Sequence, residues 1–409
     1  MTTGDLDSVN AFRPFDFSGL DILLYGDKNP FLIEYLSQVS KSFSFVEAND
    51  ALSFQKAISV DAIVFFNRAP SSILLAQLRE EGVLIQVCEN AVSLNAFQGK
   101  PTDIHERIGE SLCQLDLPQT SSLTTQKHLE KNFADLGFSV VDKFYLFPNL
   151  KTPATVLSEN FVDDYNELAS DLASAKAFVS DEPYFRFFPE TLALRNIANA
   201  GLLKEMSSAF LWIGSKGPSR TRLQLTKTLS QGELAWHFSN RRKIPLKTFF
   251  KRNADGLLQV HKAPLLTANH SDYLFRGETL QVEWSPIPSA PIVEGRKLSA
   301  LWADFLYSGR NQNAYRLLKE FISWSFERWK IEGDSQSLQG KSLDALLINA
   351  SETKSDFTEF AVPRDFALFD LEWKLKTPVS KSWFIFRNVF CLRFDFELLK
   401  ATTDRKSTR

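Results

Sequence analysis

Several features that define other protein classes are scarce in this chain, and each scarcity narrows what the protein can be. The 409 residues include only three cysteines, at positions 88, 113 and 391, with no CxxC spacing. That argues against a disulfide framework and a structural zinc site, and it favours a reducing cytoplasm. No apolar run reaches the roughly 18 residues that span a bilayer, so no transmembrane segment is expected. The first residues lack the apolar core of a signal peptide, and none is expected.

An excess of either charge is also missing. Lys and Arg number 47, and Asp and Glu number 49, which gives a formal net charge of −2. A nucleic-acid partner is therefore not expected. The five histidines are scattered, so packing or surface roles are favoured over catalysis. The hydrophobic share of 44% and the charged share of 23% are typical of a globular protein.

The N-terminal part alternates strand and helix signals. Short apolar runs predict strands, whereas apolar residues at helical spacing predict helices between them. This alternation indicates an α/β class, with a mostly parallel, Rossmann-like sheet that has helices on both faces. The expected strands cover 20–25, 43–46, 62–66, 82–87, 140–147 and 154–158, and the expected helices cover 31–39, 71–80 and 127–136.

After about residue 220 the pattern changes to short β segments followed by helices, which predicts an α+β domain. Asn253-Ala254-Asp255-Gly256 between two β segments is a hairpin signal. A helical stretch runs from 298 to 330. The expected organisation is a tail at 1–19, a Rossmann-like domain at 20–160, a connector packed on it at 161–215, a kinase-like domain at 216–398 (β lobe 216–290, helical lobe 291–398) and a tail at 399–409.

Two residues of the first domain stand where a nucleoside ligand would bind. Gly26 ends the first expected strand, where an α/β sheet opens a crevice for ligands. Glu47 ends the second expected strand, where its carboxylate can accept hydrogen bonds from a ribose diol. Together, these two residues are the minimum set needed to bind an adenosine-type ligand. Each residue also has an ordinary structural explanation, as a turn glycine and a solvated strand end.

Residues 21–160 resemble a class I S-adenosylmethionine-dependent methyltransferase of the kind found in bacterial surface-polysaccharide clusters. LLYGDKNP at 23–30 stands in place of the family's glycine motif, FVE at 45–47 matches its acidic strand end, and FYLFPNLKTP at 144–153 is similar to a segment of that subgroup. The resemblance implies S-adenosylmethionine as cofactor, bound by Gly26 and Glu47. It also implies a glycan or lipid-linked saccharide acceptor, with polysaccharide-assembly proteins as partners.

The glycine motif is reduced in this chain. Only Gly26 remains, and Asp27, Lys28 and Asn29 carry side chains where the family's backbone comes close to the methionine moiety. Cofactor binding that is altered or lost is therefore one interpretation, and retained binding is the other.

A second group of residues lies near the C-terminus. Asp344 is followed five residues later by Asn349, and an apolar strand at 366–369 is expected to end at Asp370, with Glu372 just beyond it. Phosphoryl transfer uses such a set, because an Asp orients the acceptor while an Asn and a second Asp hold magnesium. The alternative is that these acids cap turns or make structural hydrogen bonds.

The same segments resemble aminoglycoside- and choline-kinase-like enzymes, whose D-x-E ending is similar to Asp370-Leu371-Glu372. The resemblance implies Mg and ATP as cofactors, with Asp344 catalytic, Asn349, Asp370 and Glu372 as metal ligands, and Lys247 on the ATP phosphates. Lys251 is an equal candidate for the phosphate lysine. No glycine-rich loop covers the phosphates, and Ser342 stands where the family has a histidine.

Three functions therefore remain open from the sequence. The protein is a divergent methyltransferase acting on a glycan, a sugar or glycan phosphotransferase through its C-terminal lobe, or a non-catalytic scaffold in polysaccharide assembly. The subgroup with the methyltransferase-like N-terminus also resembles this chain at Phe369-Asp370-Leu371-Glu372-Trp373. That second resemblance favours a single two-part family over an accidental fusion.

Overall fold

The computed structural model describes residues 7–48, 58–97, 123–174, 190–239, 245–265, 274–276, 280–286, 289–292, 295–331, 346–347, 360–361 and 369–375. The chain forms two compact units. The first contains Met1–Arg241 with Phe249–Lys251, and the second contains Arg242–Thr248 with Arg252–Arg409.

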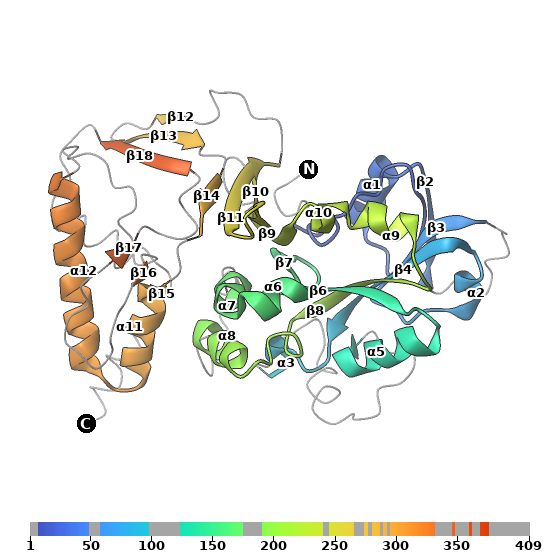
Figure 1. The fold of residues 1–409 in the computed structure, drawn as a ribbon, viewed down its shortest axis with the longest axis horizontal. Coiled ribbons are helices and arrows are strands. Elements are labelled where there is room, and N and C mark those ends of the chain that lie inside the picture. Colours follow the sequence, from blue (N-terminus) through green and yellow to red (C-terminus); the bar gives the residue numbers. More distant parts are fainter. Residues whose placement is uncertain are drawn as a thin grey trace. The chain divides into compact units, whose positions relative to one another are not determined.

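The first unit is built on a mixed sheet whose order is β9-β7-β6-β8-β4-β3-β1-β2, with β5 beside β4 (Figure 1). Strands β1 to β4 run parallel. Strand β8 is antiparallel to both β4 and β6, and β7 is antiparallel to β6 and β9. The α/β prediction is confirmed for this unit, although the antiparallel end was not expected. The strands are β1 (Asp21–Gly26), β2 (Ser42–Glu47), β3 (Val60–Phe66), β4 (Leu78–Asn90), β5 (Leu123–Thr124), β6 (Val140–Phe147), β7 (Thr155–Ser158), β8 (Ala209–Ser215) and β9 (Glu233–Ser239).

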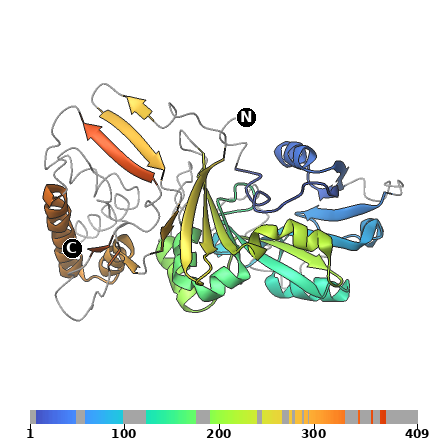
Figure 2. The same cartoon turned by 45° about the horizontal axis from the view of Figure 1, so that its top comes forward.

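Helices pack on both faces of this sheet (Figure 1 and Figure 2). Neighbouring strand residues point to opposite faces. Accordingly, Asp142 of β6 pairs with Arg222 of α9 at 2.8 Å, while Lys143 pairs with Glu130 of α5 at 2.9 Å. The helices are α1 (Pro30–Val39), α2 (Ser72–Leu75), α3 (Leu94–Phe97), α5 (Gln126–Asp135), α6 (Glu159–Asp164), α7 (Asn166–Ser174), α8 (Glu190–Asn199), α9 (Arg220–Leu225) and α10 (Lys227–Ser230).

The helix predicted at 71–80 is largely wrong. Helix α2 stops at Leu75, and Leu78 already pairs with Val60 as the first residue of β4. The polar residues Arg79, Glu80 and Glu81 gave no strand signal, so the sequence pattern favoured a helix. Pairing with β3 extends the strand through them.

Residues 7–19, expected to be part of an N-terminal tail, pack in the core of the first unit. Phe12 is completely buried, and its ring lies 6.5 Å from that of Phe66 at the end of β3. The Phe15 ring lies 4.8 Å from that of Phe144. Asn10 Nδ2 donates a hydrogen bond of 3.0 Å to the carbonyl oxygen of Pro153. Apolar packing, together with the Asn10 hydrogen bond, therefore holds residues 7–19 against the sheet.

The first unit also extends further than the expected 20–160 domain. Strand β8, from the expected connector, lies between β4 and β6, and all seven of its residues are buried. Strand β9 pairs with β7, so residues 216–239, expected in the β lobe, belong here as well. Local sequence patterns do not show which strands pair, so the place of β8 in the sheet could not be predicted.

Among its described residues, the second unit has short sheets and two helices. Strand β10 (Leu246–Arg252) is divided between the units, and its residues before Phe249 belong to the second. The hairpin signal before Gly256 is confirmed, because Asn253 N donates to Leu257 O at 2.9 Å and Gly256 adopts φ +79°. Strand β11 (Leu258–Pro264) pairs with β14 (Ser289–Pro291). In a second sheet, β13 (Leu280–Pro286) pairs with both β12 (Leu274–Arg276) and β18 (Phe369–Leu375). In a third, β16 (Leu346–Leu347) pairs with both β15 (Arg296–Lys297) and β17 (Phe360–Ala361).

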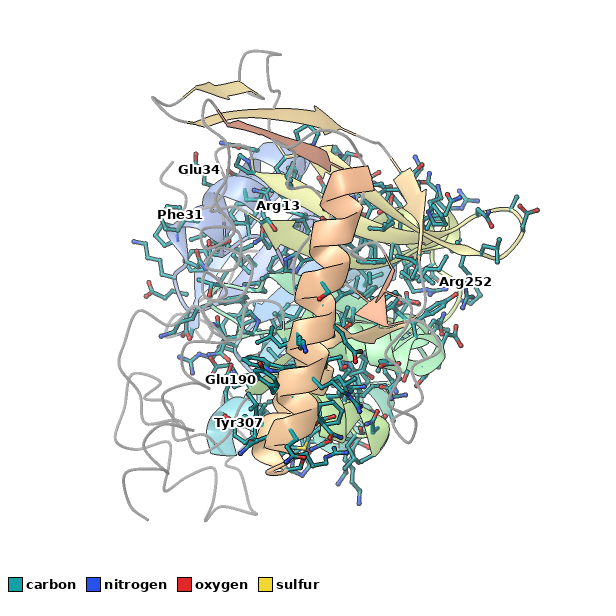
Figure 3. All side chains as sticks on the ribbon, turned by 90° about the vertical axis from the view of Figure 1, so that its left-hand side faces the viewer. Arg13, Phe31, Glu34, Glu190, Arg252 and Tyr307 are labelled. Carbon is teal, nitrogen blue, oxygen red and sulfur yellow. The ribbon has the colours of Figure 1, made fainter. Side chains whose placement is uncertain are left out.

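The helices of the second unit, α11 (Leu298–Tyr307) and α12 (Asn311–Ile331), bury a common cluster. Gly309 adopts φ +75° between them, which only glycine does without strain. Tyr307 at the end of α11 is exposed (Figure 3). In the part of the chain that the structure describes, neither these helices nor the others are long and apolar enough to cross a membrane. The buried cluster consists of Leu298, Leu301, Trp302, Phe305, Ala314, Leu317 and Phe321.

Candidate ligand site at the ends of β1, β2 and β3

The strand order of the first unit reverses at β1. The chain leaves β1 for β2 on one side and then crosses to β3 on the other side. Ligands of open α/β sheets bind outside the carboxyl ends of the strands at such a switch point. The three strands end there with Gly26, Glu47 and Phe66.

Gly26 is required by the approach of two strands. Its φ is +151°, and a Cβ atom at this position would collide with the carbonyl oxygen of Phe66. The Phe66 side chain fills the adjacent space and is itself covered by Phe12. The glycine was predicted to let a ligand approach the backbone, but in the structure its close contact is with β3.

Glu47 lies directly beside Gly26 in the β1–β2 register and is exposed. The backbone just after it is held by Tyr25, whose hydroxyl donates to the Ala48 carbonyl oxygen at 3.2 Å. The two residues predicted from sequence are therefore brought together at one edge of the sheet. The Glu47 carboxylate is open to a ligand that lies across the ends of β1 and β2.

The three side chains that replace the expected glycines have separate roles. Asp27 Oδ1 forms an ion pair with Arg68 Nη2 at 2.6 Å, which joins the segments that follow β1 and β3. Asn29 caps α1 by accepting a hydrogen bond of 3.1 Å from Leu32 N. Lys28 is exposed. Arg68 was not predicted as a site residue, although it closely follows the expected strand at 62–66.

Arg68 is held in place by β4. Its carbonyl oxygen accepts a hydrogen bond of 2.7 Å from Gln86 Nε2, and the preceding Asn67 N donates to Val87 O at 2.7 Å. Asn67 adopts φ +54°, a left-handed conformation that Asn tolerates better than most residues.

Three polar atoms gather here without a hydrogen-bond partner in the structure. They are Asn67 Oδ1, Arg68 Nε and Gln86 Oε1, all buried. An unsatisfied buried polar atom costs about 1–3 kcal/mol, and such atoms in native proteins call for an explanation such as a functional role or a bound water. The ends of β3 and β4 therefore form a polar patch that local packing does not satisfy.

The second predicted site is only partly described. Asp344 and Asn349 lie outside the described residues. The prediction that a strand ends at Asp370 is wrong, because β18 begins at Phe369 and continues through Glu372 to Leu375. Glu372 is directly opposite Glu283 of β13, and Asp370 is opposite Ser285. Lys247 lies in β10 and is half-buried.

Neither a reactive thiol nor a metal cluster is found among the described residues. Burial raises the pKa of the Cys88 thiol, so it is protonated at neutral pH and a poor nucleophile. No group of three or more His, Cys, Asp or Glu side chains in the described part of the chain could hold a metal ion.

The first unit is therefore a mixed α/β unit whose strand order reverses at β1. No protein-family model matches the chain. No curated protein matches it either.

Solved structures give matches of low similarity. The plantazolicin methyltransferase BpumL in complex with SAH is 12% identical, with a TM-score of 0.23, over 53% of this chain and 83% of that one. YjhP from E. coli is 17% identical, with a TM-score of 0.20, over 52% and 97%. The mycolic acid cyclopropane synthase CmaA1 is 13% identical, with a TM-score of 0.23, over 51% and 87%. Similarity at these scores does not decide fold or activity, so the function must be argued from this chain's own residues.

Proposed function

We propose that this protein is a divergent methyltransferase-type protein whose first unit binds S-adenosylmethionine at the ends of β1, β2 and β3. The observation that carries the proposal is the register between Gly26 and Glu47 at the switch point. It sets an exposed carboxylate beside the end of β1, where a ribose diol can donate two hydrogen bonds to it.

The residues present are compatible with an adenosyl ligand. Glu47 is exposed and lies opposite Gly26 in the β1–β2 register. The buried polar atoms of Asn67, Arg68 and Gln86 lie at the same edge of the sheet. The first turn of α1 is capped by Asn29, so its backbone N–H groups are partly used by the protein itself.

Bound S-adenosylmethionine would supply an electrophilic methyl group. In this proposal Glu47 holds the ribose, and the N-terminus of α1 favours negative charge near Gly26. Phe12 and Phe66 keep water from one side of the strand ends because both are buried. The acceptor in the proposal is a glycan or lipid-linked saccharide, which is based on the resemblance of residues 144–153 and 369–373 to the surface-polysaccharide subgroup.

Isothermal titration calorimetry with S-adenosylmethionine and with S-adenosylhomocysteine tests the proposal. We expect binding to the wild-type protein and a loss of roughly tenfold in affinity for Glu47→Ala, because a charged acceptor of hydrogen bonds is removed. Glu34→Ala is the matched control, since Glu34 is an exposed glutamate on α1 of the same unit (Figure 3). No binding of either ligand at millimolar concentration would overturn the proposal and favour a scaffold.

A second candidate function has one observation in its favour. Residues two apart in a strand share a face, so Asp370 and Glu372 hold positions on one face of β18, and Glu283 is opposite Glu372. Carboxylate oxygens are the ligands that magnesium prefers in proteins. This supports Mg–ATP binding by the second unit, with Asp344, Asn349 and Lys247 as the further residues of a sugar or glycan phosphotransferase.

Thermal unfolding with ATP and magnesium tests the second candidate. A ligand that binds only the folded protein raises its melting temperature. We expect a magnesium-dependent rise for the wild-type protein and none for Asp370→Asn. Glu320→Gln on α12 is the control. An equal response from wild type and Asp370→Asn would contradict the assignment of Asp370 as a metal ligand.

A further inference from the structure

The ion pair between Asp27 and Arg68 lies at the switch point and remains accessible. The Arg68 side chain is 35% exposed and that of Asp27 is 46% exposed. The two residues are 41 positions apart in sequence and follow β1 and β3, the strands on either side of the switch point. A ligand bound to Glu47 would therefore lie at the same sheet edge as one anionic side chain, Asp27, and one cationic side chain, Arg68.

The Arg68 guanidinium is only partly used by the protein. One nitrogen, Nη2, contacts Asp27, while Nε is buried without a partner. A guanidinium has five N–H donors in a planar fork that fits a carboxylate through two parallel hydrogen bonds. Gln86 and Val87 fix the backbone at Asn67 and Arg68, and the ion pair with Asp27 holds the guanidinium in position before any ligand binds.

The strand spacing matches the two ends of an adenosyl amino acid. Neighbouring strands are about 4.8 Å apart, so the ends of β2 and β3, on either side of β1, are about 10 Å apart. In S-adenosylmethionine and S-adenosylhomocysteine, a flexible chain of single bonds joins the ribose to an α-amino acid group. That group carries an ammonium and a carboxylate on one carbon.

From this geometry we infer that Asp27 and Arg68 recognise the amino acid end of the ligand, the Arg68 guanidinium taking its carboxylate and the Asp27 carboxylate taking its ammonium. In the free protein the two side chains satisfy each other, and the zwitterion inserts between them without a net change in charge. The inference deepens the proposed function and rests on it. In this inference, two side chains make the contacts with the amino acid end of the ligand that the backbone of a glycine motif would otherwise make.

The same chemistry sets what the site rejects. A nucleoside diphosphate would bring several negative charges against Asp27 and has no ammonium to pair with it. An adenosine thioether that lacks the amino acid would leave Asp27 and Arg68 paired with each other. The two side chains would then add nothing to its binding affinity. The site is therefore selective for the zwitterion and not for adenosine alone.

Calorimetric titration with two thioethers tests the inference. S-adenosylhomocysteine and 5′-methylthioadenosine share the adenosine and the sulfur, and only the former has the amino acid. We expect the wild-type protein to bind S-adenosylhomocysteine at least about tenfold more tightly. Arg68→Gln should reduce that affinity to the level of 5′-methylthioadenosine and leave the affinity for 5′-methylthioadenosine unchanged. ADP should not compete.

Asp27→Asn is the second variant. It should also reduce the difference in affinity between S-adenosylhomocysteine and 5′-methylthioadenosine. It keeps the shape of the side chain, so it tests the inference even if Arg68→Gln unfolds. Arg79→Gln is the matched control, because Arg79 also forms ion pairs but with Asp21 and Asp61 at the opposite edge of the sheet. It should leave both affinities as they are.

The outcomes separate the inference from the function on which it rests. Wild-type protein that binds neither thioether contradicts the proposed function itself. Wild-type protein that binds both equally, or variants that weaken both ligands to the same extent, overturns the role of Asp27 and Arg68 and leaves adenosyl binding standing.

Discussion

Gly26 and Phe66 come so close at the ends of β1 and β3 that no side chain fits between them. The atom in the way is the backbone carbonyl oxygen of Phe66, which cannot rotate aside as a side chain could. The φ of +151° at Gly26 adds strain for any other residue. This contact sets the shape of the sheet edge at which Glu47 and Arg68 lie.

Gly26→Ala should destabilise the first unit by about 2–3 kcal/mol, through overpacking against backbone and an unfavourable φ. Urea unfolding followed by tryptophan fluorescence measures the effect. Gly217→Ala is the control, because a Cβ there meets nothing within 4 Å and the backbone is not left-handed. Equal stability of the two variants would contradict the close contact.

Phe12→Ala should cost about 3–5 kcal/mol of unfolding free energy, the usual range for a buried phenylalanine in a packed core. The ring is completely buried against Phe17 and Phe66. Leu223→Ala, at a site where the side chain is 58% exposed, should change stability by no more than about 0.5 kcal/mol. Should Phe12→Ala prove as mild as this control, residues 7–19 would not belong to the core.

Asp21 should make the stability depend on acidity. Its pKa is held below the ordinary value, first by the hydrogen bond from Arg79 Nη2 at 2.7 Å and then by the one from Ser42 Oγ at 2.8 Å. A carboxyl with a lowered folded pKa stabilises the protein above its unfolded pKa of about 3.9. That contribution is lost as the pH falls through the lower, folded value.

The measurement compares the free energy of unfolding at about pH 6 and about pH 3 in wild type and Asp21→Asn. The wild-type protein should lose more stability on acidification than the variant. Asp135→Asn, at an exposed position on α5, serves as the control for the general effect of removing a carboxylate. If Asp21→Asn and wild type lose the same amount, Asp21 does not contribute to the pH dependence.

Cys88 should be unreactive in the folded protein. Its thiol is buried and its pKa is raised by desolvation, so little thiolate forms at neutral pH. The experiment uses a variant with Cys113 and Cys391 replaced by serine, so that only Cys88 can react with an aromatic disulfide reagent. Labelling should be slow in buffer and rapid in denaturant. Rapid labelling in buffer would show that β4 opens readily.

Local sequence patterns predicted much of the first unit because its strands are continuous apolar runs. The strand at 62–66 is fully buried, and the helix at 31–39 starts at a proline after an asparagine cap. Gly26 and Glu47 were found for the same reason, since each ends a recognisable strand. The start of β4 was missed because its residues Arg79 to Glu81 are polar and carry no strand signal of their own. They adopt strand structure because β4 pairs with β3.

Arg68 could not be predicted as a site residue, because its partner Asp27 is distant in sequence and meets it only through the β1–β3 pairing. The burial of residues 7–19 is likewise a tertiary effect. The contact of Phe12 with Phe66 requires the sheet to exist first. Spacing within one segment reports local structure, whereas these features depend on which segments become neighbours.

The position of β8 in the sheet has a consequence for folding during synthesis and for the choice of expression fragments. The strand is hydrogen-bonded to β4 and β6 on its two sides, but it is the last of the three to be synthesised. Until residue 215 has left the ribosome, β4 and β6 have open edges that can pair with another chain. An expression fragment ending near residue 160 would keep those edges permanently. Fragments for biochemical work should therefore include β9 and the residues of β10 that belong to the first unit, and so end no earlier than residue 251.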